Sequence, residues 1–254
     1  MRRVVPWLGL FLLAVSFVWF IRLPTQPAVT LRKPPVRPEK SFVVVLDPGH
    51  GGQDSGAMCG TMLEKDLTLD IALRAALLLR ADGFATVMTR DTDRYVSLAE
   101  RASLGNREDN SLFVSIHFND SGSEVASGVE TYYAQQSARP GFLWWLPFLQ
   151  RTEASPLLPK SESLANCLQT ALVARTSAVN RGIKAGQFYV IANVQHPAAL
   201  VEGGFLTNKS DVARLATVEY RQELAAAIHD GVDRYRTAIR KGEPMLTLAA
   251  TRPE

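Results

Sequence analysis

Short apolar runs of strand length alternate with longer stretches of helical periodicity along most of the chain after residue 40. The runs predict strands over residues 42–46, 85–88, 112–116, 129–133, 188–191 and 199–201. Apolar side chains recur at helical spacing over residues 63–81, 97–107, 162–178 and 218–239. Because parallel strands are joined by helices that cover the sheet, this alternation predicts an α/β fold with a mostly parallel open sheet of about six strands and helices on both faces.

The first 22 residues depart from this pattern. Val4 to Ile21 is an uninterrupted uncharged run preceded by Arg2 and Arg3, and as a helix it would span roughly 27 Å. A basic pair before such a run favours a cytoplasmic N-terminus and an exported remainder. We expect residues 1–22 to be a signal anchor that crosses the cytoplasmic membrane through residues 4–21, or a signal peptide. The anchor predicts a protein of the cell envelope, periplasmic or on the outer face of that membrane, whereas cleavage would secrete it.

Residues 23–40 combine five prolines with basic side chains, a composition that stays extended and cannot bury a core. We expect a spacer there, then one folded domain over 41–241 and a tail over 242–254. Residues 1–40 carry a formal charge of +6, which leaves −3 on the rest of the chain. A pI near 8.9 therefore reflects the leader, and we expect no nucleic-acid partner.

The two cysteines, Cys59 and Cys167, lie far apart in the sequence and show no CxxC spacing. Neither a disulfide framework nor a thiolate zinc site is indicated. One disulfide between them is compatible with an oxidising compartment.

Two of the four histidines follow predicted strands. His50 comes after the strand 42–46 and the short stretch 47–49, and His117 comes directly after the strand 112–116. In an open α/β sheet, ligands bind beyond the carboxyl ends of the strands, so both imidazoles are expected at one crevice. Taken singly, a histidine at such a position is more often a loop or core residue than a metal ligand. His196, before a proline, and His229, within the last helix, are interpreted as structural.

Two carboxylates strengthen the metal interpretation. Glu64 begins the first helix, and Glu202 ends an apolar strand, where burying a carboxylate is costly unless a partner neutralises it. The alternatives are an acid at the positive end of a helix dipole for Glu64 and a salt bridge for Glu202. Two histidines and one carboxylate with an open fourth position form a recurrent catalytic zinc set, and a further glutamate supplies the base.

Four sequence strings occur in order along the domain: VLDPGHGG at 45–52, EKDL at 64–67, SIHFN at 115–119 and PAALVEGGFLTN at 197–208. Together they resemble the zinc-dependent N-acetylmuramoyl-L-alanine amidases of the AmiC and LytC type. The resemblance covers residues 42–238 and includes Arg181-Gly182-Ile183-Lys184. It implies that the domain over 41–241 is an amidase catalytic domain that cuts peptidoglycan between N-acetylmuramic acid and the L-alanine of the stem peptide.

The resemblance also implies roles for individual residues. His50, Glu64 and His117 are expected to bind one Zn²⁺ per chain, and Glu202 is expected to be the catalytic base rather than a metal ligand. Asn119, Gly51 and Arg181 are candidates for substrate binding.

Residues 134–161 form a connection longer than a strand and a helix require, and they contain a cluster of aromatic side chains. Long ordered loops are often functional, and exposed aromatic clusters mark contact surfaces. In some of the amidases that this chain resembles, an insertion at this point covers the zinc cleft until a partner draws it away. The resemblance therefore implies that residues 134–161 are a lid on which a regulatory protein acts, and contact with a lipid interface is the other expectation. A satellite core packed on the domain is the alternative.

Two rival functions stay open at this point. A zinc peptidase acting on stem peptides would use the same metal chemistry, with Arg181 or Lys184 holding a terminal carboxylate. An inactive peptidoglycan-binding module would keep the fold without turnover, although such modules typically lose a ligand or the base, and all four residues are present here.

Overall fold

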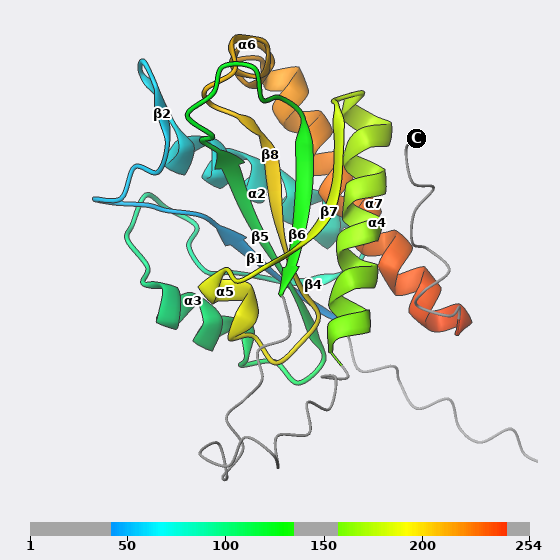
Figure 1. Ribbon diagram of the computed structural model, residues 1–254. Coiled ribbons are helices and arrows are strands. Elements are labelled where there is room, and N and C mark those ends of the chain that lie inside the picture. The colour runs from blue at the N-terminus through cyan, green and yellow to red at the C-terminus, as the bar shows by residue number, and fades with distance from the viewer. Residues whose placement is uncertain (1–41, 135–156, 243–254) are drawn as a thin grey trace, which may run out of the picture. The chain divides into compact units, whose positions relative to one another are not determined.

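The computed structural model describes residues 42–134 and 157–242, which form an α/β domain around one six-stranded sheet (Figure 1). The strand order is β4-β1-β5-β8-β6-β7, and four of the five strand pairs are parallel. The strands are β1 (Val43–Pro48), β4 (Ala85–Met88), β5 (Ser111–Asn119), β6 (Val129–Ala134), β7 (Asn180–Gly186) and β8 (Ala198–Phe205). The predicted α/β class with a mostly parallel open sheet of six strands is confirmed.

Helices cover both faces of this sheet, as predicted. The helices are α2 (Glu64–Ala81), α3 (Leu98–Gly105), α4 (Leu158–Thr176), α5 (Tyr189–Ala192), α6 (Lys209–Leu215) and α7 (Val218–Lys241). The larger core packs one face of the sheet against α2, α4 and α7, and a smaller core packs the other face against α3 and α5. Alternation along the buried strands separates the two cores: Val114 and Ile116 enter the larger one and Phe113 the smaller.

One predicted strand is wrong. Residues 189–192 form the short helix α5 instead. Val190 and Ile191 are both buried while Phe188 and Tyr189 are exposed, so the buried side chains are adjacent rather than alternate as in a half-buried strand. The sixth strand is instead β7, an edge strand in which no residue is buried and Ile183 is the largest apolar side chain. The prediction also missed α6 and a small hairpin of β2 (Met58–Cys59) and β3 (Met62–Leu63).

Strand β6 runs antiparallel to β8, so its arrow points opposite to that of β5 in Figure 1. Ala134, its last residue, therefore lies near the end of the sheet at which β8 begins. Helix α4 starts at that same end, where the Ser161 hydroxyl oxygen accepts a hydrogen bond from the Ala198 N–H at 3.1 Å. Both described ends of the 134–161 connection thus lie about four strand residues, roughly 13 Å, from the level of Glu202. Residues 135–156 themselves are outside the described structure.

The localisation inferred from an N-terminal anchor is corrected. Across the described ranges 42–134 and 157–242, no helix has the length and apolar character needed to cross a bilayer. The segments interpreted as anchor or signal peptide, spacer and tail fall almost wholly outside those ranges. No disulfide joins Cys59 to Cys167.

Close packing of α4 on α7 gives a first prediction. A Cβ at Gly231 of α7 would lie 2.8 Å from the Leu168 Cα of α4, and backbone cannot rotate out of the way. Gly231→Ala should therefore destabilise the domain by about 1–3 kcal/mol, despite the better helix propensity of alanine. Arg234→Ala, an exposed site on the same helix, should leave the free energy of urea-induced unfolding within ~0.5 kcal/mol. A Gly231→Ala protein as stable as the parent contradicts the packing argument.

Candidate metal centre

His50 is placed by a strained turn at the end of β1. Its φ is +59°, a left-handed conformation that non-glycine residues rarely adopt. Two buried arginines hold the turn through its carbonyls. Arg101 donates to the carbonyl oxygens of His50 at 2.5 Å and Pro48 at 2.6 Å, and Arg90 donates to those of Pro48 at 3.1 Å and Gly49 at 2.8 Å.

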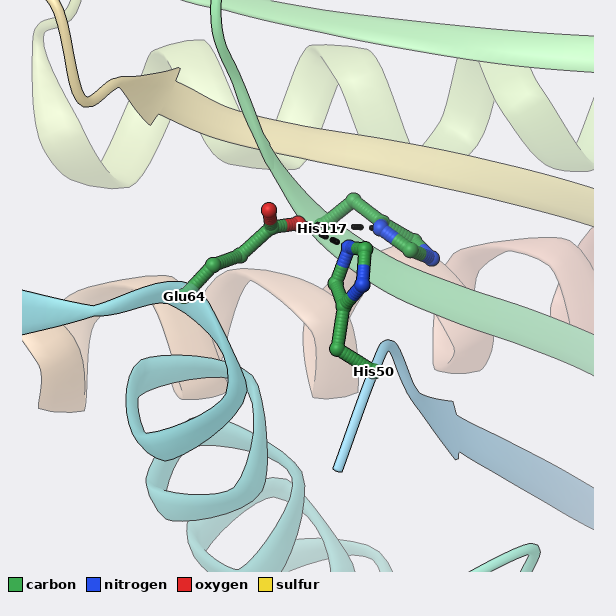
Figure 2. Close-up of side chains that lie close together, drawn as sticks. All are labelled: His50, Glu64 and His117. Carbon is green, nitrogen blue, oxygen red and sulfur yellow. Dashed lines mark hydrogen bonds and ion pairs between the residues drawn. The ribbon is translucent and has the colours of Figure 1, made fainter. Parts of the chain in front are cut away.

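His117 lies two residues before the end of β5, and Glu64 is the first residue of α2. Figure 2 shows the three side chains converging from three different elements. Glu64 Oε1 lies 3.1 Å from His50 Nε2 and 3.0 Å from His117 Nδ1. One ligand atom from each residue lies within 4.8 Å of the others. The sequence-predicted metal set is therefore brought together, and two imidazoles with one carboxylate match the donor chemistry of zinc.

The electrostatics of the set favour an ionised carboxylate. Burial by itself raises the pKa of Glu64, but hydrogen bonds with His117 and His50 outweigh it and hold the pKa far below its usual range. Burial lowers the pKa of His50, and the neighbouring Glu64 and Asp54 carboxylates raise it above the ordinary value. Glu64 Oε2 also accepts the Ala57 N–H at 2.8 Å, so its orientation is fixed from both oxygens.

Asp54 is a supporting residue that the sequence did not reveal. Its Oδ2 lies 2.9 Å from His50 Nδ1, and its Oδ1 accepts the Gly56 N–H at 3.1 Å. A proton on Nδ1, donated to this carboxylate, leaves His50 Nε2 as the nitrogen that faces Glu64. The signal available was a carboxylate four residues after a candidate metal histidine, in a glycine-rich loop.

Two glycines leave room for the metal set. A Cβ at Gly49 would lie 2.3 Å from the His117 ring, so this position needs glycine for close approach rather than for an unusual φ. Gly56 has a φ of +65°, and a Cβ there would approach Glu64 Oε2 to 2.5 Å and the His50 ring to 2.6 Å. Neither glycine therefore tolerates a side chain without moving a predicted zinc ligand.

Glu202 lies beside the metal set on the same face of the sheet. It pairs with His117 of β5 on one side and with Glu130 of β6 on the other, which forms a row across three strands. Glu202 is buried, and its Oε2 has no hydrogen-bond partner among the described residues. Burial, with the Glu64 and Glu130 charges, raises the pKa of Glu202 well above the ordinary value. An unpartnered buried carboxyl next to a donor set is suited to exchange a proton.

Glu130 is the other residue that the sequence did not reveal, and it contacts two of the predicted substrate-binding residues. It accepts from Asn119 Nδ2 and from Arg181 Nε, each at 2.7 Å. Gly51, the third candidate, is buried, and its N–H already donates to the Asp54 carbonyl oxygen at 2.9 Å. Substrate binding by these three residues stays a prediction. A glutamate inside a predicted strand is ordinarily an exposed residue, so no local pattern singles out Glu130.

The two histidines interpreted as structural have no place in the metal set. His229 lies on α7 and contacts Asp230 at 3.1 Å and Asp82 at 3.4 Å. Among the described residues, the one group of at least three His, Cys, Asp or Glu side chains close enough to hold a metal consists of His50, Glu64 and His117.

Residues 44–234 match the N-acetylmuramoyl-L-alanine amidase family, a span that contains all of these residues. The chain belongs to that family. The predicted resemblance and the predicted enzyme class, a peptidoglycan amidase acting on the bond between N-acetylmuramic acid and L-alanine, are thereby confirmed.

Individual amidases are similar over most of this chain. LytC of Bacillus subtilis is 36% identical over 85% of this chain, and the match covers 40% of LytC. The germination-specific N-acetylmuramoyl-L-alanine amidase of the same organism is 31% identical over 96% of this chain and 99% of its own length. Two amidase structures are also similar. One, from Clostridium difficile 630, has a TM-score of 0.67 at 32% identity over 79% of this chain and 99% of its own. The other, CwlD of Clostridioides difficile in complex with the GerS lipoprotein, has a TM-score of 0.66 at 25% identity over 77% and 98%.

The Asp54 contact gives a prediction for the amidase site. Removing the carboxylate that orients a metal-binding histidine typically weakens metal affinity 10–100-fold, so Asp54→Ala should raise the zinc dissociation constant by about that factor. Competition with a chromophoric chelator measures it. Asp91→Ala, an exposed aspartate in another loop, is the matched control and should bind zinc like the parent. Equal zinc affinities of Asp54→Ala and the parent would remove Asp54 from the site.

Proposed function

We propose that this chain is a zinc-dependent amidase that releases stem peptides from peptidoglycan by cutting the amide between N-acetylmuramic acid and L-alanine. The observation that carries the proposal is the donor set of His50, Glu64 and His117 together with the buried, unpartnered Glu202, which pairs with His117 on the neighbouring strand. The donor types fit zinc, and the 3.0–3.1 Å separations between Glu64 Oε1 and the two imidazole nitrogens show that the side chains already converge.

In this mechanism the residues divide the work. Zinc held by His50, Glu64 and His117 would supply Lewis-acid chemistry, which activates water and polarises the amide carbonyl. Glu202 takes a proton from the attacking water and delivers it to the leaving nitrogen of L-alanine, because a carboxyl with a raised pKa can act first as base and then as acid. Asp54 fixes the orientation of His50, and Arg90 and Arg101 fix the turn that carries it.

A regulatory protein that acts on residues 134–161 stays a prediction, since most of that connection lies outside the described residues. Support for a protein partner comes from a relative: CwlD was solved in complex with the GerS lipoprotein.

The metal assignment predicts that His50→Ala and His117→Ala each lose zinc, because a site left with two protein ligands binds metal far more weakly. Inductively coupled plasma mass spectrometry on the dialysed chain should find about one zinc in the parent and in a His229→Ala control, and a small fraction in the two variants. Full zinc content in either variant would falsify the ligand set.

The base assignment predicts that Glu202→Gln keeps zinc but lowers turnover by at least about 10², the usual scale for loss of a positioned base. Mass spectrometry of digested cell wall measures both the rate and the product. Stem peptides that begin at L-alanine identify the amidase, whereas shortened stems identify a peptidase and the absence of release a binding module. Glu219→Gln, an exposed glutamate at the start of α7, is the control and should keep full activity. Loss of zinc in Glu202→Gln would instead make Glu202 a ligand.

A further inference from the structure

The side chains of Arg181 and Lys184 are held close to the proposed active site by one buried carboxylate, Glu130. Glu130 is 1% exposed, and its Oε2 accepts from Arg181 Nε at 2.7 Å and from Lys184 Nζ at 2.5 Å. Its Oε1 accepts from Asn119 Nδ2 and from the Tyr132 hydroxyl, each at 2.7 Å. All four contacts are donors to an ionised carboxylate, which therefore fixes the position of both cations.

The charges of this group do not cancel. Two cations face one carboxylate, which leaves a formal charge of +1 on Glu130, Arg181 and Lys184 together. The side chains of Arg181 and Lys184 are 33% and 37% exposed, so each is anchored on its inner side and open to solvent on the other. Within the described residues, the Nη groups of Arg181 have no hydrogen-bond acceptor, although its guanidinium lies 4.8 Å from the centre of the Phe205 ring. A fixed pair with surplus charge and unused donors is suited to bind an anion.

The position of the pair relates it to the proposed reaction. Three strands carry His117, Glu202 and Glu130 in register. Lys184 lies on the next strand outward, β7, where it pairs with Tyr132 of β6. Since neighbouring strands are about 4.8 Å apart, the Glu130 backbone lies roughly 10 Å from that of His117, and the cations bound to its carboxylate lie on the same face.

The proposed substrate carries an anion at a matching place. A stem peptide whose second residue is D-glutamate joined through its γ-carboxyl keeps a free α-carboxylate. That carboxylate lies about two residues, or roughly 7 Å, from the scissile amide in an extended chain. An amidated stem carries a neutral carboxamide there instead, and it would lose the ionic part of the contact.

We propose that Arg181 and Lys184, positioned by Glu130, form a subsite that binds the free α-carboxylate of the second stem residue and makes the enzyme prefer stems that are not amidated. This subsite rests on the proposed amidase function for its role in turnover. It also predicts binding of the isolated peptide, which needs no catalysis.

The kinetic test compares two soluble muropeptides that differ only in D-isoglutamate or D-isoglutamine at the second stem position. The full chain with zinc should show a kcat/KM about tenfold higher for the carboxylate form, mainly through KM, on the scale of one charge-assisted contact at a half-exposed site. Lys184→Gln and Arg181→Gln should each bring the ratio between the two substrates toward one, while Lys209→Gln, 88% exposed on α6, should keep it. A merely structural role would lower both rates together and leave the ratio unchanged.

A binding measurement separates failure of the subsite from failure of the proposed function. Isothermal titration into the full chain compares two dipeptides whose γ-carboxyl is blocked as an amide: L-alanyl-D-glutamine, which keeps a free α-carboxylate, and L-alanyl-D-glutamine amide, which has no carboxylate. The first should bind more tightly, and Lys184→Gln should remove the difference. If the chain releases no stem but this difference is found, the amidase function fails and the subsite stands. Equal affinity of the two dipeptides for the parent, or a difference that survives in Lys184→Gln and Arg181→Gln, overturns the subsite.

Discussion

One carboxylate oxygen, Glu64 Oε1, is the point on which the metal centre depends. It lies within 3.1 Å of both His50 Nε2 and His117 Nδ1, and it also accepts the Phe118 N–H at 3.0 Å. Those contacts connect the start of α2 to the turn after β1 and to the end of β5. The desolvation cost of burying this carboxylate is offset only while all three elements are in place, so the site and the packing of α2 on the sheet depend on each other.

The same dependence explains why two arginines are buried beneath the site. Arg90 and Arg101 are 1% and 3% exposed. Arg101 forms a salt bridge with the buried carboxylate of Asp47. Most of their other hydrogen bonds go to backbone carbonyls of the His50 turn and the first turn of α2. Backbone groups in an irregular turn have no strand or helix partner, and a guanidinium can satisfy several of them at once. The left-handed conformation of His50 is stabilised in this way.

The sequence predicted the parts of the fold that rest on strong apolar periodicity. The α/β class, the four long helices and five of the six strands follow from it. The meeting of His50, Glu64 and His117 follows as well, because the two histidines stand at the carboxyl ends of parallel strands and Glu64 begins the helix that follows the first of these strands. It failed where tertiary contacts decide the structure. Edge strand β7 has little apolar signal, and α5 has an apolar run that reads like a strand. Asp54 and Glu130 were missed because their importance comes from the residues they contact across the fold rather than from any local pattern.

The reversed direction of β6 has a consequence for how this domain can vary between relatives. Because β6 ends and α4 begins at the end of the sheet where β8 starts, the connection between them joins the domain on the side away from His117 and Glu202. Insertions and deletions there change neither the strand register that aligns His117, Glu202 and Glu130 nor the turn that carries His50. New recognition segments can therefore be acquired or lost at this point in evolution, or grafted in the laboratory, while the metal donors keep their positions.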